Sequence, residues 1–172
     1  MFELTYAPWD ANGRQVSEVK RVSLDLGSNL SRFECRYAAG NPPVTVAAGL
    51  VMHSATSILA HDDNWASLWE KFSEGEGPGF IPVGLVWSAA SGGQFKQAEH
   101  HALVVSELQA GQPFVYYAGA GWSKGPDFPD AATWNAYLKA FAARLNSPLH
   151  VTLTGDIAGG TSGMNAGELN HR

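Results

Sequence analysis

The residues of this chain that are best suited to chemistry follow a glycine-rich bend in the stretch PFVYYAGAGWSKGPDFPD, residues 113–130. An aromatic segment leads into AGAG, and Trp122, Ser123 and Lys124 come next. Glycines permit a tight bend or a close approach by another backbone. An aromatic face can stack on the C–H groups of a sugar, while a hydroxyl and an amine can bind its polar groups. We interpret Trp122 and Ser123 as substrate-binding residues and Lys124 as a cation that neutralises a carboxylate.

Two adjacent tyrosines precede this bend. Successive side chains of a strand point to opposite faces, so Tyr116 and Tyr117 cannot share a face. One is expected in the core and the other can line a cleft, where a phenol can transfer a proton during elimination from a sugar. The hypothesis assigns substrate binding to Tyr116 and proton transfer to Tyr117.

His100 and His101 are adjacent on a strand predicted over residues 98–108, so one of them at most faces a given site. An imidazole titrates near neutrality and suits general acid or base catalysis. Either histidine is a catalytic candidate, with Glu99 as an acidic neighbour. A structural, hydrogen-bonded histidine is the other interpretation and stays open.

Trp69 and Glu70 form another candidate pair, because tryptophan beside a carboxylate suits sugar binding and Glu70 could transfer a proton. Glycoside hydrolysis generally needs two placed carboxylates, and the sequence does not identify the second. A core tryptophan with a solvated glutamate is an equally open interpretation.

A metal site is the weaker alternative for the histidines. His53, His61 and Asp62 could converge with His100 or His101 to give a histidine and carboxylate ligand set. The sequence has no recognised ligand spacing among them. No cofactor is therefore predicted, and a divalent metal remains an alternative.

Composition excludes several classes of function. The chain has 172 residues and a formal net charge of −5, without the basic excess that nucleic acid binding needs. Cys35 is the only cysteine, so no intramolecular disulfide forms, and its alternation with apolar neighbours predicts burial. No segment reaches transmembrane length, and residues 1–10 do not read as a signal peptide. Dinucleotide and serine-hydrolase motifs are also absent.

Short alternating segments separated by turn residues predict an antiparallel β-sandwich with one packed helix. The domain is expected over residues 1–154, and residues 155–172 are expected to be a flexible polar tail. Asp130 is the expected N-cap of a helix over residues 131–145. Strands are predicted at residues 1–6, 16–26, 30–37, 44–53, 65–72, 80–87, 98–108, 114–117 and 149–153.

Several separate blocks of the sequence carry a resemblance. They are DANGRQVSEVKRVSLDLGSNLSRFECRY, TVAAGLV, LWE, EHHALVV and YYAGAGWSKGPDFPDAATWNAYL. Over residues 1–154 the chain resembles the C-terminal half of the bacterial domain-of-unknown-function family 4861. Members are typically longer, are exported and occur beside polysaccharide-degrading enzymes. Their architecture is similar to the galactose-mutarotase-like β-sandwich, which implies that this chain is half of a supersandwich.

The residues and the resemblance together imply a carbohydrate lyase or dehydratase that acts on uronic-acid-containing oligosaccharides. A non-catalytic carbohydrate-binding or accessory subunit is the second interpretation, and a metal-dependent carbohydrate hydrolase or oxidase is the third. A half sandwich would expose edge strands and apolar faces, so we expect a homodimer or a missing N-terminal half as partner. The resemblance implies a periplasmic or secreted location.

Overall fold

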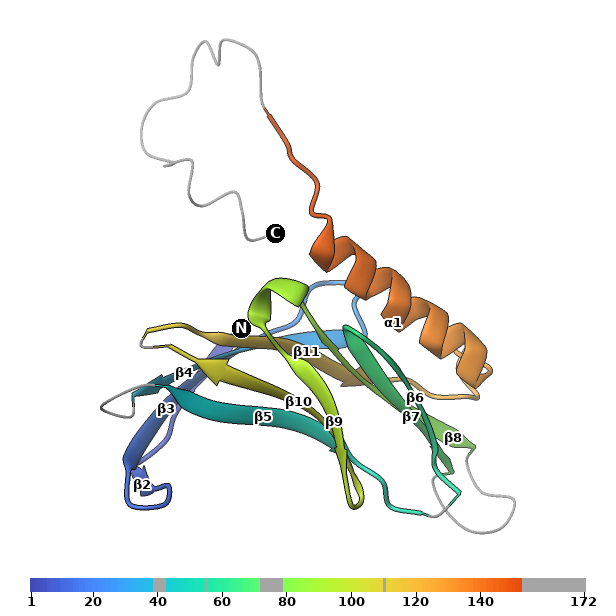
Figure 1. Ribbon diagram of the computed structural model, residues 1–172. Helices are drawn as coiled ribbons and strands as arrows, with labels where there is room; N and C mark the ends of the chain where they lie inside the picture. Colours follow the sequence, from blue (N-terminus) through green and yellow to red (C-terminus); the bar gives the residue numbers. More distant parts are fainter. Residues whose placement is uncertain (39–42, 55, 72–78, 110, 153–172) are drawn as a thin grey trace.

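Alternating apolar and polar residues build two antiparallel sheets in the computed structural model, which describes residues 1–38, 43–54, 56–71, 79–109 and 111–152 (Figure 1). The larger sheet has the order β1-β3-β4-β11-β8-β7-β6, and β2 pairs with β3. Its strands are β1 (Phe2–Thr5), β2 (Trp9–Asp10), β3 (Gln15–Ser23), β4 (Leu30–Ala38), β6 (Ile58–Asp62), β7 (Trp65–Lys71), β8 (Phe80–Trp87) and β11 (Phe114–Ala120). The smaller sheet has the order β5-β10-β9, formed by β5 (Val44–Val51), β10 (His101–Leu108) and β9 (Gln94–Ala98).

The main core lies between the two sheets. On β10, Ala102, Val104 and Leu108 alternate with more exposed residues and are almost fully buried. Val104 and Leu108 belong to the same cluster as Trp87 and Cys35 from the larger sheet. Burial of alternate residues on two facing sheets defines a β-sandwich, so the predicted fold class and the burial of Cys35 are confirmed.

Helix α1 (Ala131–Asn146) covers the outer face of the larger sheet against β7 and β8 (Figure 1). Its N-cap is Asp130, whose carboxylate accepts a hydrogen bond of 2.7 Å from the Thr133 N–H. Trp134 and Leu138 are fully buried in a second apolar cluster. Gly84 permits the close contact, because a Cβ there would lie 2.7 Å from Leu138 Cδ2. The predicted helix and its cap are confirmed, and none of the described helices is long and apolar enough to cross a membrane.

Some predicted element boundaries were wrong. Residues 149–152 form no strand, and Leu149 and Val151 are 93% and 77% exposed; residue 153 and the predicted tail lie outside the described residues. The alternation there was too short to imply a partner strand. The segment 98–108 is not one strand: it holds the last residue of β9, a turn with Glu99 at a φ of +48°, and then β10. His100 therefore lies in the turn, and only His101 belongs to a strand.

Candidate functional site

The topology gathers most of the predicted site residues at one end of the sandwich. There β7 ends beside the start of β8, with Glu70 opposite Ile81. The Met52 N–H, one residue after β5, donates a 2.7 Å hydrogen bond to the His100 carbonyl and so brings the turn between β9 and β10 to this end. The Ser123 N–H likewise donates a 3.0 Å bond to the Phe80 carbonyl. Residues at this end, which we call the histidine end, are His53, Trp69, Glu70, His100, His101, Trp122, Ser123 and Lys124 (Figure 1, the end of β7 away from its turn with β6).

A histidine and a glutamate form a hydrogen-bonded pair at this end. His53 Nδ1 lies 3.0 Å from Glu70 Oε2, and the His53 backbone N–H donates to Glu70 Oε1 at 2.8 Å. The Ser57 hydroxyl donates a third hydrogen bond, of 2.5 Å, to Glu70 Oε1. The Glu70 side chain is 13% exposed, whereas that of His53 is 76% exposed. The carboxylate is therefore fixed within the sandwich while the imidazole faces solvent.

The charge of Glu70 determines what this pair can do. Burial raises the pKa of Glu70, but hydrogen bonds from Ser57 and His53 outweigh it and hold the pKa below its ordinary value. An ionised carboxylate can only accept hydrogen bonds, so His53 Nδ1 carries the proton of that bond. In the neutral ring, Nε2 then presents its lone pair. Such an oriented imidazole can accept and return a proton.

The loop after β11 lies against the start of β8. The Phe80 N–H donates a 2.8 Å hydrogen bond to the Ser123 hydroxyl oxygen, so this residue holds the loop in place. Its hydroxyl proton can still be donated. A Cβ on Gly79, whose φ is +103°, would lie 3.3 Å from Lys124 Cγ. Trp122 is 51% exposed and Lys124 is also exposed, as ligand-contacting residues would be.

Three aromatic residues proposed for the site pack within the fold. Tyr117 lies on the helix side of the larger sheet, edge-on to Phe141 with ring centroids 5.0 Å apart. Tyr116 faces the other way and stacks on Phe33 at 4.9 Å. Trp69 is 7% exposed and stacks on Phe80. The opposite orientation of the two tyrosines agrees with the strand pattern, and neither of them lies at the histidine end.

The proposed metal ligands lie at two different ends of β7. His61 pairs with Ala66, which precedes Glu70 by four residues, or about 13 Å along the strand. His61 and Asp62 are thus far from His53. In the described segments, no group of three or more His, Cys, Asp or Glu side chains could hold a metal ion.

A buried ionic cluster on the inner face of β3 and β4 was missed. Glu18 is 8% exposed, and its Oε1 lies 3.3 Å from Lys20 Nζ, an ion pair without hydrogen-bond geometry. Lys20 also lies over the Tyr6 ring, 5.2 Å from its centroid. Burial lowers the pKa of Lys20, but the charge of Glu18 together with Cys35 and Tyr6 outweighs it and raises the pKa overall. The sequence signal for this ion pair was a Glu and a Lys two residues apart, which places opposite charges on one face of a strand.

Cys35 lies on the same face as this ion pair, and its thiol is expected to be unreactive. Burial raises the pKa of Cys35 to about 11, Lys20 lowers it and Glu18 raises it further. An unperturbed thiol has a pKa of about 8.5, so at about pH 8 the folded chain should react with iodoacetamide at least a hundredfold more slowly than the unfolded chain. Mass spectrometry of timed samples with and without guanidinium measures both rates. Equal rates would contradict the burial of this thiol.

Comparison with known proteins gives a family. The sequence profile described as "Domain of unknown function (DUF4861)" matches residues 1–151. A curated relative, "Uncharacterized protein P7" of Formosa agariphila, is 32% identical over 156 residues, which cover 88% of this chain and 39% of the relative. The chain thus spans less than half the length of that relative. No solved structure matches this chain significantly. Because the profile covers nearly all of the described residues, this chain belongs to the DUF4861 family.

Proposed function

We propose that this chain is a carbohydrate-active protein that binds uronic-acid-containing oligosaccharides at the histidine end and cleaves them by β-elimination. The observation that carries the proposal is the exposed His53 imidazole held by the ionised, mostly buried Glu70. Elimination needs a base at the surface with a fixed orientation. Lys124 and the exposed Trp122 at the same end supply a cation and an aromatic face.

The reaction assigns a step to each of these groups. Lys124 neutralises the sugar carboxylate, which makes the neighbouring C5 proton more acidic. His53 Nε2 accepts that proton, the released electron pair forms the C4–C5 double bond, and the C4–O bond breaks. The leaving oxygen then takes a proton, which the His53 imidazolium can return. Glu70 stabilises the imidazolium between these two steps through its bond to Nδ1.

A non-catalytic carbohydrate-binding or accessory subunit is the second candidate. Its support is the length of the chain, which spans 39% of the curated relative. A longer protein can supply catalytic groups that this chain does not hold. In this case the histidine end would bind the acidic sugar without turnover.

One experiment distinguishes these two functions. The purified chain is incubated with oligosaccharides of galacturonic, glucuronic and mannuronic acid while the absorbance of the unsaturated product is followed. Calorimetric titration of the same samples measures binding, and neutral oligosaccharides of equal length serve as controls for the absorbance of the unsaturated product. Absorbance that grows with enzyme concentration supports the lyase. Binding without product supports the accessory subunit, and neither binding nor product from any acidic sugar would contradict the proposal.

A further inference from the structure

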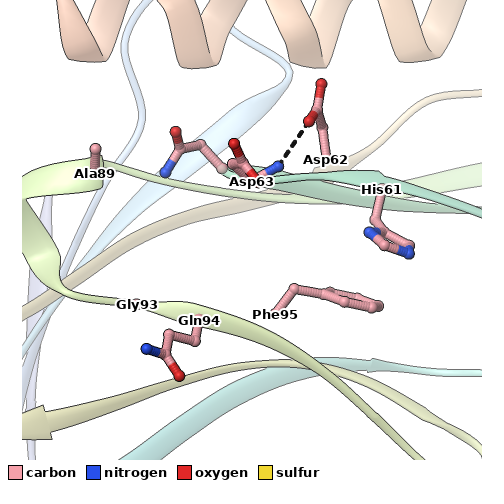
Figure 2. A pocket seen from close by; sticks show the side chains of 8 residues that line it. His61, Asp62, Asp63, Ala89, Gly93, Gln94 and Phe95 are labelled. Carbon is pink, nitrogen blue, oxygen red and sulfur yellow. Dashed lines mark hydrogen bonds between the residues drawn. The ribbon is translucent and has the colours of Figure 1, made fainter.

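We propose a second saccharide site, specific for neutral sugars, in a groove beside the turn between β6 and β7. A cavity of about 600 Å³ lies there, between this turn and the start of β9 (Figure 2). The turn is at the opposite end of β7 from Glu70, so the groove is separate from the histidine end. It is lined by His61, Asp62, Asp63, Asn64, Ala89, Gly93, Gln94 and Phe95.

The groove has an aromatic platform. The His61 ring stacks on Phe95 with centroids 3.8 Å apart and planes 14° from parallel, as Figure 2 shows. His61 comes from the edge strand β6 of the larger sheet, and Phe95 comes from the edge strand β9 of the smaller one. Phe95 is partly buried against the core between the sheets, whereas His61 is exposed. The exposed His61 ring is thus supported by Phe95 and can contact the C–H groups of a sugar.

The polar groups around this platform are held in place. Asp62 Oδ1 accepts a 2.9 Å hydrogen bond from the Asp63 N–H, drawn in Figure 2. The Asn64 carbonyl accepts from the Trp87 N–H at 3.0 Å, and the Asn64 side chain accepts from Asn146 of α1 at 3.1 Å. A turn that is bonded to β8 of its own sheet and to α1 loses little further conformational freedom when a ligand binds.

The charge of the groove selects the kind of sugar. Asp62 and Asp63 place two carboxylates along the cavity, and Asn64 and Gln94 add amides. Carboxylates accept hydrogen bonds from sugar hydroxyls, and charge-assisted bonds of this kind are stronger than neutral ones. A uronate on the His61 platform would meet these like charges, because no Lys or Arg is among the residues that line the larger cavity. The expected ligand is therefore a neutral, hydroxyl-rich saccharide, unlike the acidic sugar proposed for the histidine end.

A buried donor beside the groove is a second, independent observation. A smaller cavity of about 180 Å³, on the helix side of the turn, shares Asp62, Asp63 and Asn64 with the groove and is also lined by Trp65 and by Lys139 of α1. Trp65 is 8% exposed, and its indole N–H has no hydrogen-bond partner among the residues that the structure describes. A buried donor without an acceptor is unfavourable. A ligand oxygen would provide the acceptor once the side chains around the buried indole move to admit it.

The test follows the tryptophan indole N–H signals of the isotope-labelled full chain in two-dimensional NMR spectra. Xylohexaose is titrated as the neutral probe and hexagalacturonate as the acidic one. The Trp65 signal, identified with Trp65→Phe, is expected to shift and saturate with xylohexaose alone. The Trp134 indole already donates to the Val83 carbonyl at 3.3 Å within the helix-side core and serves as the internal reference.

A pair of matched variants makes the test specific. Asp63→Ala is expected to weaken xylohexaose binding about tenfold or more, because it removes a charged acceptor from the groove. Asp127→Ala, at an exposed acid after β11, should leave the affinity unchanged. The dispersion of the same spectra reports whether each variant is folded.

The proposal is overturned if the Trp65 signal stays in place up to about 10 mM xylohexaose, a concentration that detects even weak sugar binding. It is equally overturned if both probes shift the signal alike, or if the two aspartate variants bind alike. The result does not depend on His53. A failed lyase assay together with a saturable Trp65 shift would contradict the proposed function and support this site.

Discussion

Replacing Gly119 with alanine is expected to lower the free energy of unfolding by about 3 kcal/mol, the upper part of the usual range for overpacking. A Cβ on Gly119 would overlap the carbonyl oxygen of Asn29 and lie 3.0 Å from Leu30 Cα. These are backbone atoms, so they cannot move aside as a flexible side chain could. Relief would require separation of β11 from β4, where Gly119 is paired with Leu30.

Urea denaturation followed by tryptophan fluorescence measures this effect. The matched control is Ala120→Gly, one residue along the same strand, where the side chain is exposed. Loss of a methyl group there should cost about 0.5–1 kcal/mol through backbone entropy. If both variants unfolded at the same urea concentration, the close approach of Asn29 to Gly119 would be wrong.

The fold could be predicted where one face of an element is buried and the other is not. Residues 30–37 alternate so regularly that the pattern alone places Cys35 in the core, where it is 1% exposed. The helix was equally clear, since Trp134 and Leu138 repeat at helical spacing after the Asp130 cap. In both cases the spacing of the apolar residues indicates which side of the element is buried.

Where that asymmetry is missing, the sequence was ambiguous. Residues 65–69 of β7 are all buried because α1 covers one face, while Ala66 on the other face packs in the core with the smaller sheet, so no alternation marks the strand. Polar edge strands gave a different difficulty. His61 and Asp62 end β6 but resemble a loop, because an edge strand with exposed side chains has a loop-like composition.

The candidate site shows a related limit. Glu70 was identified as a proton-transfer group and His53 only as a weak metal ligand, and nothing in the sequence links residues 17 positions apart. Their contact arises because the segment that follows β5 crosses the end of β7, and this depends on the topology of the two sheets. The residue types alone identify the candidate catalytic groups, whereas the topology of the sheets determines which of them are in contact.

The pair of His53 and Glu70 leads to the second large effect, which rests on the proposed β-elimination. His53→Ala is expected to lower kcat on the acidic oligosaccharide about a hundredfold to ten-thousandfold, the usual contribution of a general base. The affinity for the sugar should change little, because Lys124 and Trp122 are intact. His150→Ala, at an exposed histidine beyond α1, is the matched control and should retain full activity.

Glu70 acts through His53, so its substitution is expected to differ in kind. In Glu70→Gln the neutral amide no longer favours the imidazolium, and kcat should fall about tenfold to hundredfold, the loss typical of carboxylates that orient a metal-binding histidine. Glu107→Gln, at an exposed glutamate of β10, is its control.

Added imidazole should restore part of the activity of His53→Ala but none of that of Glu70→Gln, whose histidine still occupies the site. Unchanged turnover in both variants would show that His53 is not the base. If instead kcat falls, imidazole restores no activity and both variants unfold at lower denaturant, the pair is a structural link between β5 and β7.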